Sequence, residues 1–380
     1  RLIIEARSGA PGNRTPLKLF QKVTMNKKSY YEQLEVFRAI AALSICSLHF
    51  DFNTTIHHYF GNEIFVQLFF TLSGFVIFLN YFEKINNKND IISFFKKRFK
   101  RLYPLHLFFL LVFLFVEVAK YIFYLKYGIE ANNKAFSENN IQNFFLNIFF
   151  LQHLAETHSF NSPSWSISVE MMLYITSGII FLYFKKSISW ICAIYILVFL
   201  IFFNNLYGAN LSMDAYFSGL YSFFIGCLFC FLFIKKKLII KNIYYEIFYL
   251  FFLVFFFVEF FYLKFIDNEY LYSIFFGLIF FLSCFLKKNS IIYKALFNSF
   301  FIYLGKISYS IYLSHIFVIW TIKQFLRFVM DVPTIINNNI IYLDMKNLDE
   351  NLITIFAFLI TIIFSSFTYR FIELKFYKKR

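Results

Sequence analysis

The sequence has little of what sheet-rich or disulfide-rich proteins need: its 380 residues include 11 Gly, 5 Pro and 5 Cys. So few glycines and prolines supply little turn chemistry for a many-stranded sheet. Five cysteines are too few for disulfide bonds to stabilise a chain of this length. Charged residues are also scarce, at 16% against about 25% in soluble domains. Sheet-rich, disulfide-stapled and ordinary soluble folds are therefore not expected.

Apolar and aromatic residues are abundant instead. Hydrophobic residues make up 59% of the chain and aromatic residues 24%, with 62 Phe among them. This apolar content excludes intrinsic disorder. We predict an all-α, polytopic integral membrane protein, for which the lipid bilayer is the first partner.

The five cysteines lie inside apolar stretches. Cys227 and Cys230 form a C-x-x-C pair, but no second pair and no nearby histidine completes a zinc-binding set. We interpret them as small core residues, and we expect no metal.

The balance of charge is basic, with 37 Lys and Arg against 22 Asp and Glu, a formal net charge of +15. In a soluble protein this excess would suggest a nucleic-acid partner. Here the cations form short clusters between apolar stretches, the pattern that orients membrane helices. Nucleic acid is therefore not an expected partner.

Residues 1–24 differ in composition from the rest, because they mix Pro, Gly, Arg and Ser with little Phe. Met25 is followed by Asn-Lys-Lys, a plausible natural start. We treat 1–24 as a leader or a mis-called start. Residues 25–380 are expected to form a single membrane domain.

Ten segments are long and apolar enough to suggest membrane spans, since a spanning helix needs about 20 mainly apolar residues. The stretch 141–152 is too short to span and predicts an interfacial or re-entrant helix. The ten segments are 34–50, 63–82, 103–126, 167–184, 188–203, 215–234, 244–263, 270–286, 307–326 and 352–372.

The basic clusters predict the topology, because Lys and Arg are enriched in cytoplasmic loops. The connection 83–101 is rich in Lys and Arg and is assigned to the cytoplasm. With the amino terminus inside, every later basic cluster then falls inside as well. Ten spans with both termini cytoplasmic follow, and a crossing at 141–152 would reverse the later clusters. The connections 127–166 and 327–351 are expected outside.

Charged side chains within spans are functional candidates, because they are costly to place in a membrane. Arg38 and His49 are eleven residues apart, which places them on one face of a helix and about 16 Å apart along its axis. A plainer alternative is that Arg38 snorkels while paired with Glu35 and that His49 caps the outer helix end. For the isolated acid Glu117, pairing with a hydroxyl or amide of another helix is the favoured interpretation.

Five further motifs accompany this pair. Together with Arg38 and His49 they resemble, in order, the acyltransferase family 3 membrane proteins, bacterial enzymes that acylate sugars of surface glycans. The resemblance extends over about residues 31–377. The five are LFFTLSGF at 68–75, R-x-x-R-x-x-P at 98–104, PSWSISVE at 163–170, LGKISYSIYLSH at 304–315 and YRFIE at 369–373.

The resemblance implies that Arg38 and His49 are essential. It also implies that a cytoplasmic acyl-CoA, acetyl-CoA first, is the donor, and that a surface or lipid-linked glycan is the acceptor. The expected location is the bacterial cytoplasmic (inner) membrane. The sequence departs from the family pattern at Gln67, Leu173 and Ser314, where an acidic residue, Phe and Trp are common.

These residues suggest a mechanism. The guanidinium groups of Arg38, Arg98 and Arg101 suit the phosphates of coenzyme A. His49 is the expected general base toward a sugar hydroxyl, and Glu170 is expected to orient its imidazole or to stabilise its charged form. The same set permits an acyl-histidine intermediate. Three further residues expected to line or pack the cavity are Tyr309, Tyr312 and His315.

The competing interpretation is a carrier of a glycan or small solute without covalent chemistry. Carriers usually show internal repeats and helices broken near mid-membrane. The sequence has no evident repeat, and the one proline within a predicted span, Pro104, is expected in the first turn of its helix. The sequence therefore favours the enzyme, and it leaves the acceptor, the acyl group and the oligomeric state open.

Overall fold

The computed structural model describes residues 31–50, 54, 59–129, 131–203, 214–235, 242–263, 269–337, 340–345 and 348–377. The predicted leader at 1–24 lies outside these residues. Helices dominate the described part, and one two-stranded sheet accompanies them. The longer helices are α2 (Gln33–His49), α4 (Ile64–Tyr81), α5 (Lys88–Tyr127), α7 (Trp165–Tyr183), α8 (Ile188–Val198), α9 (Asp214–Lys235), α10 (Asn242–Val258), α11 (Tyr272–Ser283), α14 (Ser308–Phe328) and α15 (Glu350–Thr368).

Shorter elements connect or extend these helices. Among them, π-helical turns continue α8, α10 and α15 over five residues each. The short helices are α6 (Ile141–Ile148), α12 (Ile291–Leu296), α13 (Ser299–Lys306) and α16 (Leu374–Tyr377), the 3₁₀ turns are Ser162–Ser164, Lys185–Ser187 and Glu269–Leu271, and the π turns are Phe199–Phe203, Glu259–Leu263 and Tyr369–Glu373.

All ten predicted spans coincide with helix. Within the described residues, seven helices are long and apolar enough to cross a membrane, and α13 with α14 would add an eighth, bent by 70°. The two remaining predicted spans are the shorter helices α2, of 17 residues, and Glu269–Ser283. The chain is therefore an all-α polytopic membrane protein, and the count of ten remains a prediction.

The centre of the bundle is a close crossing of α4 and α9. Gly74 and Gly226 lie at this crossing, where a Cβ atom at either position would overlap a backbone carbonyl of the other helix. Glycine is required here because only its missing side chain lets two helix backbones come this close. Gly305 of α13 meets the backbone of Glu35 of α2 in the same way.

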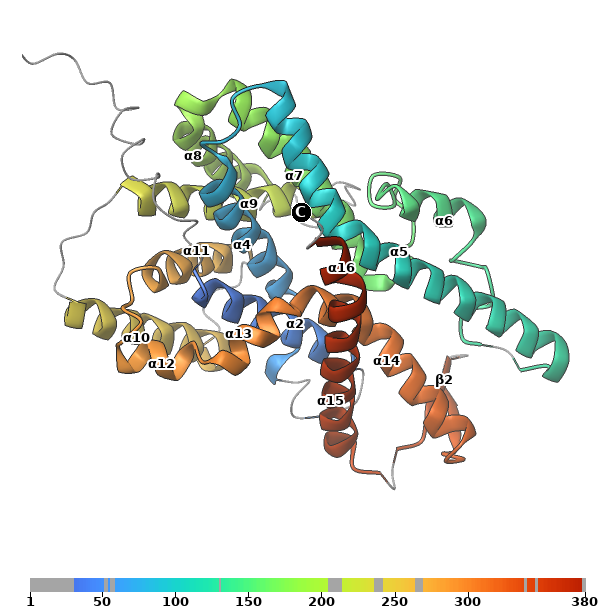
Figure 1. Cartoon of the computed structure of the whole chain (residues 1–380). Coiled ribbons are helices and arrows are strands. Elements are labelled where there is room, and N and C mark those ends of the chain that lie inside the picture. The colour runs from blue at the N-terminus through green and yellow to red at the C-terminus, as the bar shows by residue number, and fades with distance from the viewer. Residues whose placement is uncertain are drawn as a thin grey trace, which may run out of the picture.

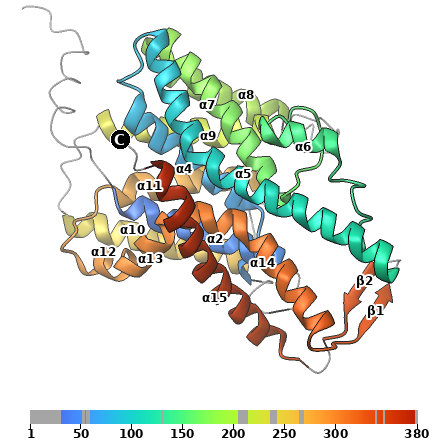
Figure 2. The ribbon, with the colours of Figure 1, turned by 45° about the vertical axis from the view of Figure 1, so that its right-hand side comes forward.

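Helix α5 is longer than predicted. Asn87 and Asp90 form a capping box at its start, so the helix begins in the basic segment and Pro104 lies inside it rather than in its first turn. The basic segment is helical because it is amphipathic: Phe94 and Leu102 are buried, while its lysines face outward. In Figures 1 and 2, α5 runs from the end of the molecule that holds α8 to the end that holds the sheet.

The segment after α5 and the segment after α14 meet at that second end. The predicted short helix at 141–152 is confirmed in its first part, because α6 runs from Ile141 to Ile148. The sheet, absent from the all-α prediction, is an antiparallel hairpin of β1 (Thr334–Asn337) and β2 (Ile340–Leu343). Asn132 ties it to the loop after α5 through hydrogen bonds with both the carbonyl and the N–H of Ile341. Figure 2 shows the hairpin beside the last turns of α5.

Candidate active site

A narrow cleft of about 90 Å³ lies among α2, α4, α5, α7 and α14. Arg38, Arg98 and Arg101 line it together with Glu170. These are four of the five residues that the sequence singled out, and they come from three helices. The cleft therefore has an excess of positive charge in an otherwise apolar bundle, which favours an anionic ligand.

Arg38 shares its charge with Glu35. Its Nη1 lies 2.7 Å from Glu35 Oε1, and both side chains are largely buried. The plainer interpretation predicted that Arg38 pairs with Glu35, and this ion pair is confirmed. Because Arg38 also lines the cleft, the ion pair positions the guanidinium there and does not exclude a role in binding.

Arg98 is more deeply buried, with 8% of its surface exposed. Its Nη2 donates to the Tyr81 hydroxyl at 3.1 Å, and the guanidinium lies over the Tyr81 ring. Its buried Nε has no hydrogen-bond partner among the described residues. A buried donor without a partner is costly, so Arg98 is suited to an acceptor group that enters the cleft.

Glu170 lies with the arginines. Its carboxylate accepts hydrogen bonds from Ser73 and Tyr174, and no hydrogen bond or ion pair joins it to His49 within the described chain. The expectation that Glu170 orients His49 therefore lacks the contact it requires. Its position one turn into α7 places it beside the cleft instead.

The neighbour of His49 is a second histidine. His315 Nε2 lies 3.3 Å from His49 Nδ1, and His315 is fully buried. His49 Nδ1 also lies 2.9 Å from the carbonyl oxygen of Ile45. Since a carbonyl can only accept, Nδ1 carries the proton and Nε2 of His49 keeps its lone pair. His315 Nδ1 faces the Ile311 carbonyl in the same manner, which leaves its Nε2 as an acceptor toward His49.

His49 does not line the cleft, whereas Tyr312 lies next to both the cleft and His315. The Tyr312 ring lines the cleft and its centroid lies 6.1 Å from that of His315. Its hydroxyl contacts Ser166 Oγ at 2.8 Å and the carbonyl oxygen of Pro163 at 3.0 Å. These contacts join the PSWSISVE and SYSIYLSH motifs, and Tyr312 with Ser166 forms a wall of the cleft that is adjacent to His315.

Two other motif residues have structural partners. Tyr309 donates to the carbonyl of Leu102 at 2.7 Å and so ties α14 to α5 beside Arg101. Ser310 donates to Glu373 Oε2 at 3.1 Å, which accounts for the acid of the YRFIE motif. The expectation that Tyr309 and Tyr312 line the cavity is confirmed.

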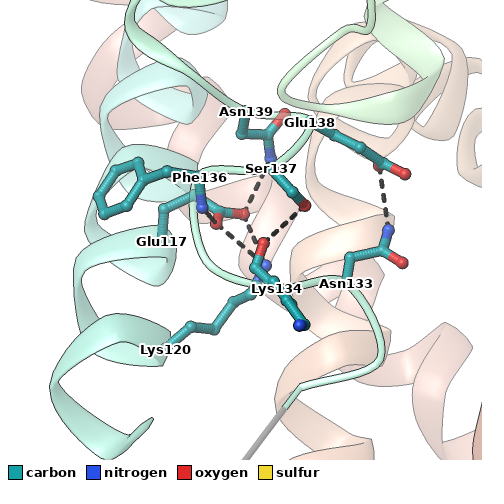
Figure 3. Close-up of polar contacts among 8 residues, drawn as sticks. All are labelled: Glu117, Lys120, Asn133, Lys134, Phe136, Ser137, Glu138 and Asn139. Atoms are coloured by element: carbon teal, nitrogen blue, oxygen red, sulfur yellow. Dashed lines mark hydrogen bonds and ion pairs between the residues drawn. The ribbon is translucent and has the colours of Figure 1, made fainter. Parts of the chain in front are cut away.

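Glu117 is paired, but with its own helix and the loop that follows it rather than with another helix as expected. Its carboxylate accepts from Asn139 Nδ2 at 3.0 Å, from the Phe136 N–H at 2.9 Å and from Lys120 Nζ at 2.8 Å (Figure 3). This buried acid therefore fastens the loop after α5 to the helix.

The cysteines are core residues, as predicted. Cys46, Cys192, Cys227 and Cys230 are buried and Cys284 is half-buried, all as free thiols. Within the part of the chain that the structure describes, no group of three or more His, Cys, Asp and Glu is placed to hold a metal ion.

The comparison with known families covers nearly the whole bundle. A family model described as an acyltransferase domain, that of acyltransferase family 3, matches residues 31–370. The match contains every residue of the cleft and of the histidine pair. No curated protein and no solved structure matches the chain.

Proposed function

This chain belongs to acyltransferase family 3, and from that premise we propose that it transfers an acyl group, acetyl first, from acyl-CoA to a hydroxyl of a surface or lipid-linked glycan. The observation that carries the proposal is the cleft in which Arg38, Arg98 and Arg101 meet. Arg38 is paired with Glu35, but Arg98 and Arg101 face only the acid Glu170 among the residues that line the cleft. These guanidinium groups favour a ligand with several negative charges, such as coenzyme A.

The shape of the cleft supports a divided mode of donor binding. A volume of about 90 Å³ admits a slender chain but not a nucleotide. We therefore place the pantetheine arm inside the cleft and the nucleotide at its mouth. Arg98, with its buried Nε, is the group best placed to receive an oxygen of the donor.

The histidine pair supplies the base. With Nδ1 held by Ile45 and His315, Nε2 of His49 is free to take a proton from the acceptor hydroxyl. The hydroxyl oxygen then attacks the thioester carbonyl, the new C–O bond forms, and the C–S bond breaks. The proton passes from His49 to the departing thiolate of coenzyme A. An acyl-histidine route remains the second possibility for the same residues.

The proposed setting is the bacterial inner membrane, with ten spans and both termini in the cytoplasm. The basic segment that precedes Arg98 then lies on the cytoplasmic side, where acyl-CoA is made. In this arrangement the wall of Tyr312, Ser166 and Pro163 lies between the donor cleft and the outer side. The acyl group must pass this wall, so movement of Tyr312 is part of the proposed reaction.

His49→Gln and His49→Ala test the proposal. Glutamine keeps a hydrogen-bonding side chain but cannot carry the proton, so both variants should lose acylation by a factor on the order of 100–10,000. The measurement is labelled acetyl transferred from acetyl-CoA to glycan in membranes, normalised to the amount of protein. The matched control is His106→Gln, because His106 Nε2 makes one hydrogen bond to the Asn147 carbonyl that glutamine can replace.

Two outcomes would contradict the proposal. More than half of the normalised wild-type acylation in His49→Gln would reject His49 as the base. Glycan export by wild-type protein without any acyl transfer would favour the carrier.

A further inference from the structure

A second cavity, of about 1220 Å³, lies at the end of the molecule that holds the hairpin. We name it the hairpin cavity. Its lining comes from the second half of α5, from 131–139, from 157–165, from α14 after Tyr312, from 334–335, from 341–345 and from Glu350. Neither the family match nor the donor cleft assigns it a role. Its volume is sufficient for a ligand of several rings.

Helix α14 leads from the donor cleft to the hairpin cavity. Tyr312 lines the cleft, whereas Ile316, Trp320 and Arg327 line the cavity. These residues recur at helical spacing and therefore share one face of α14, with Tyr312 and Trp320 about 12 Å apart along the axis. The side chain next to Ser166, Trp165, also lines the cavity. The cavity thus begins just beyond the wall that closes the cleft.

The charges of the hairpin cavity cancel. The four cationic and four acidic side chains that line it leave no net formal charge, in contrast to the arginine-rich cleft. A polyanion would meet as many repulsive as attractive groups here, so an uncharged polar ligand is favoured. The eight are Lys120, Lys134, Lys323, Arg327, Glu117, Glu138, Asp344 and Glu350.

The rest of the lining suits a sugar. Two of the three tryptophans of the chain, Trp165 and Trp320, lie in this cavity and are half-buried. An indole face can pack against the C–H face of a sugar ring, while amide groups donate to and accept from its hydroxyls. Asn133, Asn139 and Gln324 supply amides with remaining hydrogen-bonding capacity, whereas both polar groups of Asn132 hold Ile341.

Hydrogen bonds within the chain hold two segments of the cavity wall in place. Glu117 holds the 136–139 turn through Phe136 and Asn139 (Figure 3), and Asn132 holds the hairpin through both polar groups of Ile341. Such preformed walls lower the ordering cost of binding.

We propose that the hairpin cavity binds an uncharged stretch of the acceptor glycan, with Trp165 and Trp320 as stacking platforms. The proposal rests on the proposed function, because it supplies the acceptor for that reaction. It places the sugar on the far side of Tyr312 from the donor, so that one hydroxyl can reach the histidine pair when the wall opens.

Tryptophan fluorescence tests this binding directly. The probes are oligosaccharides released from the envelope of the source cells and separated into uncharged and anionic fractions. The protein is the full chain in detergent, carrying His49→Gln to prevent turnover and Trp190→Phe to remove the exposed tryptophan of α8. We expect the uncharged fraction to change the fluorescence saturably. Adding Trp320→Ala should weaken this binding about tenfold, a typical effect of a lost aromatic contact.

The controls separate this inference from the proposed function. In the active enzyme, which retains His49, Trp320→Ala should raise KM for the acceptor and leave KM for acetyl-CoA unchanged. Trp320→Phe should bring KM for the acceptor back toward the wild-type value. Binding only by the anionic fraction, binding only by phosphorylethanolamine as a lipid headgroup, or unchanged binding in Trp320→Ala would each overturn the cavity assignment. A protein that binds the uncharged fraction but transfers no acetyl group would instead reject the proposed function.

Discussion

Arg38 and Arg98 reach the same cleft but use their hydrogen-bonding capacity differently. Arg38 is held by an ion pair with Glu35, whereas Arg98 has one hydrogen bond to Tyr81 and a buried Nε without a partner in the described chain. Arg38 is therefore already neutralised in part, and Arg98 gains more from an incoming anion. At the scale of residues, we therefore expect Arg98 to contribute more than Arg38 to the affinity for the donor.

Arg98→Ala is expected to weaken the use of acyl-CoA. A charge-assisted hydrogen bond contributes about 1.5–3 kcal/mol, so KM for acetyl-CoA should rise by roughly 10–150-fold. Arg98→Lys should recover only part of this loss, because lysine lacks the planar fork. The measurement is initial acylation rate against acetyl-CoA concentration, with Lys97→Ala, an exposed neighbour on α5, as the control. An unchanged KM in Arg98→Ala would assign Arg98 to folding or topology alone.

The contact between His315 and His49 was not predicted from the sequence. The motif SYSIYLSH identified His315 as a cavity residue, but the contact with His49 joins positions 266 residues apart, which no local pattern encodes. The sequence predicts that Glu170 orients the imidazole of His49, because Glu170 is acidic and lies near the start of a helix. In the structure His315 contacts His49, while Glu170 lies among the arginines.

Replacing His315 tests its role as a positioning residue. His315→Gln keeps an acceptor for the Nδ1–H of His49, whereas His315→Leu removes it. We expect Leu to lower kcat by at least tenfold with little change in KM for acetyl-CoA, and Gln to restore a substantial part of kcat. The kcat and KM values are measured at matched protein abundance. Equal activity of the Leu and Gln variants would show that the hydrogen bond to His49 has no part in the reaction.

At the scale of elements, the apolar pattern was sufficient to locate the helices but not their ends. All ten predicted segments contain helix, because a stretch of about 20 apolar residues has few alternatives in a membrane. The start of α5 was missed, since its helical basic segment is amphipathic and not apolar. The hairpin was missed because its strands have only four residues each, too few for a clear periodic signal. Its second strand is held by Asn132 of a distant loop.

Glycine at the helix crossings gives the sharpest test of this packing. Gly305→Ala should destabilise the protein, because the added Cβ would overlap the backbone of Glu35, and it should disturb Arg38 through the Glu35 ion pair. Gly178→Ala is the matched control, since its Cβ would lie 3.4 Å from Ile91 Cγ2, an ordinary contact. The measurement is the melting temperature in detergent together with abundance in the membrane. Equal melting temperatures for the two variants would contradict the close crossing of α2 and α13.

At the scale of the whole molecule, the two cavities differ in charge as the two proposed substrates do. The arginine cleft is positive, the hairpin cavity is neutral, and one face of α14 passes from one to the other. The sequence identified the arginines through their motifs, yet it held no sign of the hairpin cavity. That cavity is lined by loops that Glu117 and Asn132 hold through hydrogen bonds. Such long-range contacts leave no periodic pattern in the sequence.

The orientation of the two cavities in the membrane is the last prediction, and cysteine labelling decides it. Ile336→Cys in the hairpin, 74% exposed as Ile in the wild type, should react with a membrane-impermeant maleimide in intact cells. Lys287→Cys, exposed between α11 and α12, should react only after lysis. The positive-inside pattern requires this result, because the cations at 287–294 belong with those at 83–101 in the cytoplasm.

The parent chain is the control for that labelling, since its native cysteines are buried or half-buried and should react slowly from either side. Labelling of Lys287→Cys in intact cells would reverse the second half of the bundle relative to the first. The hairpin cavity, which lies farther along α14 than the donor cleft, would then face the cytoplasm. In that event an acyl-CoA made in the cytoplasm would meet the acceptor on its own side, and transfer across the membrane would be excluded for this chain.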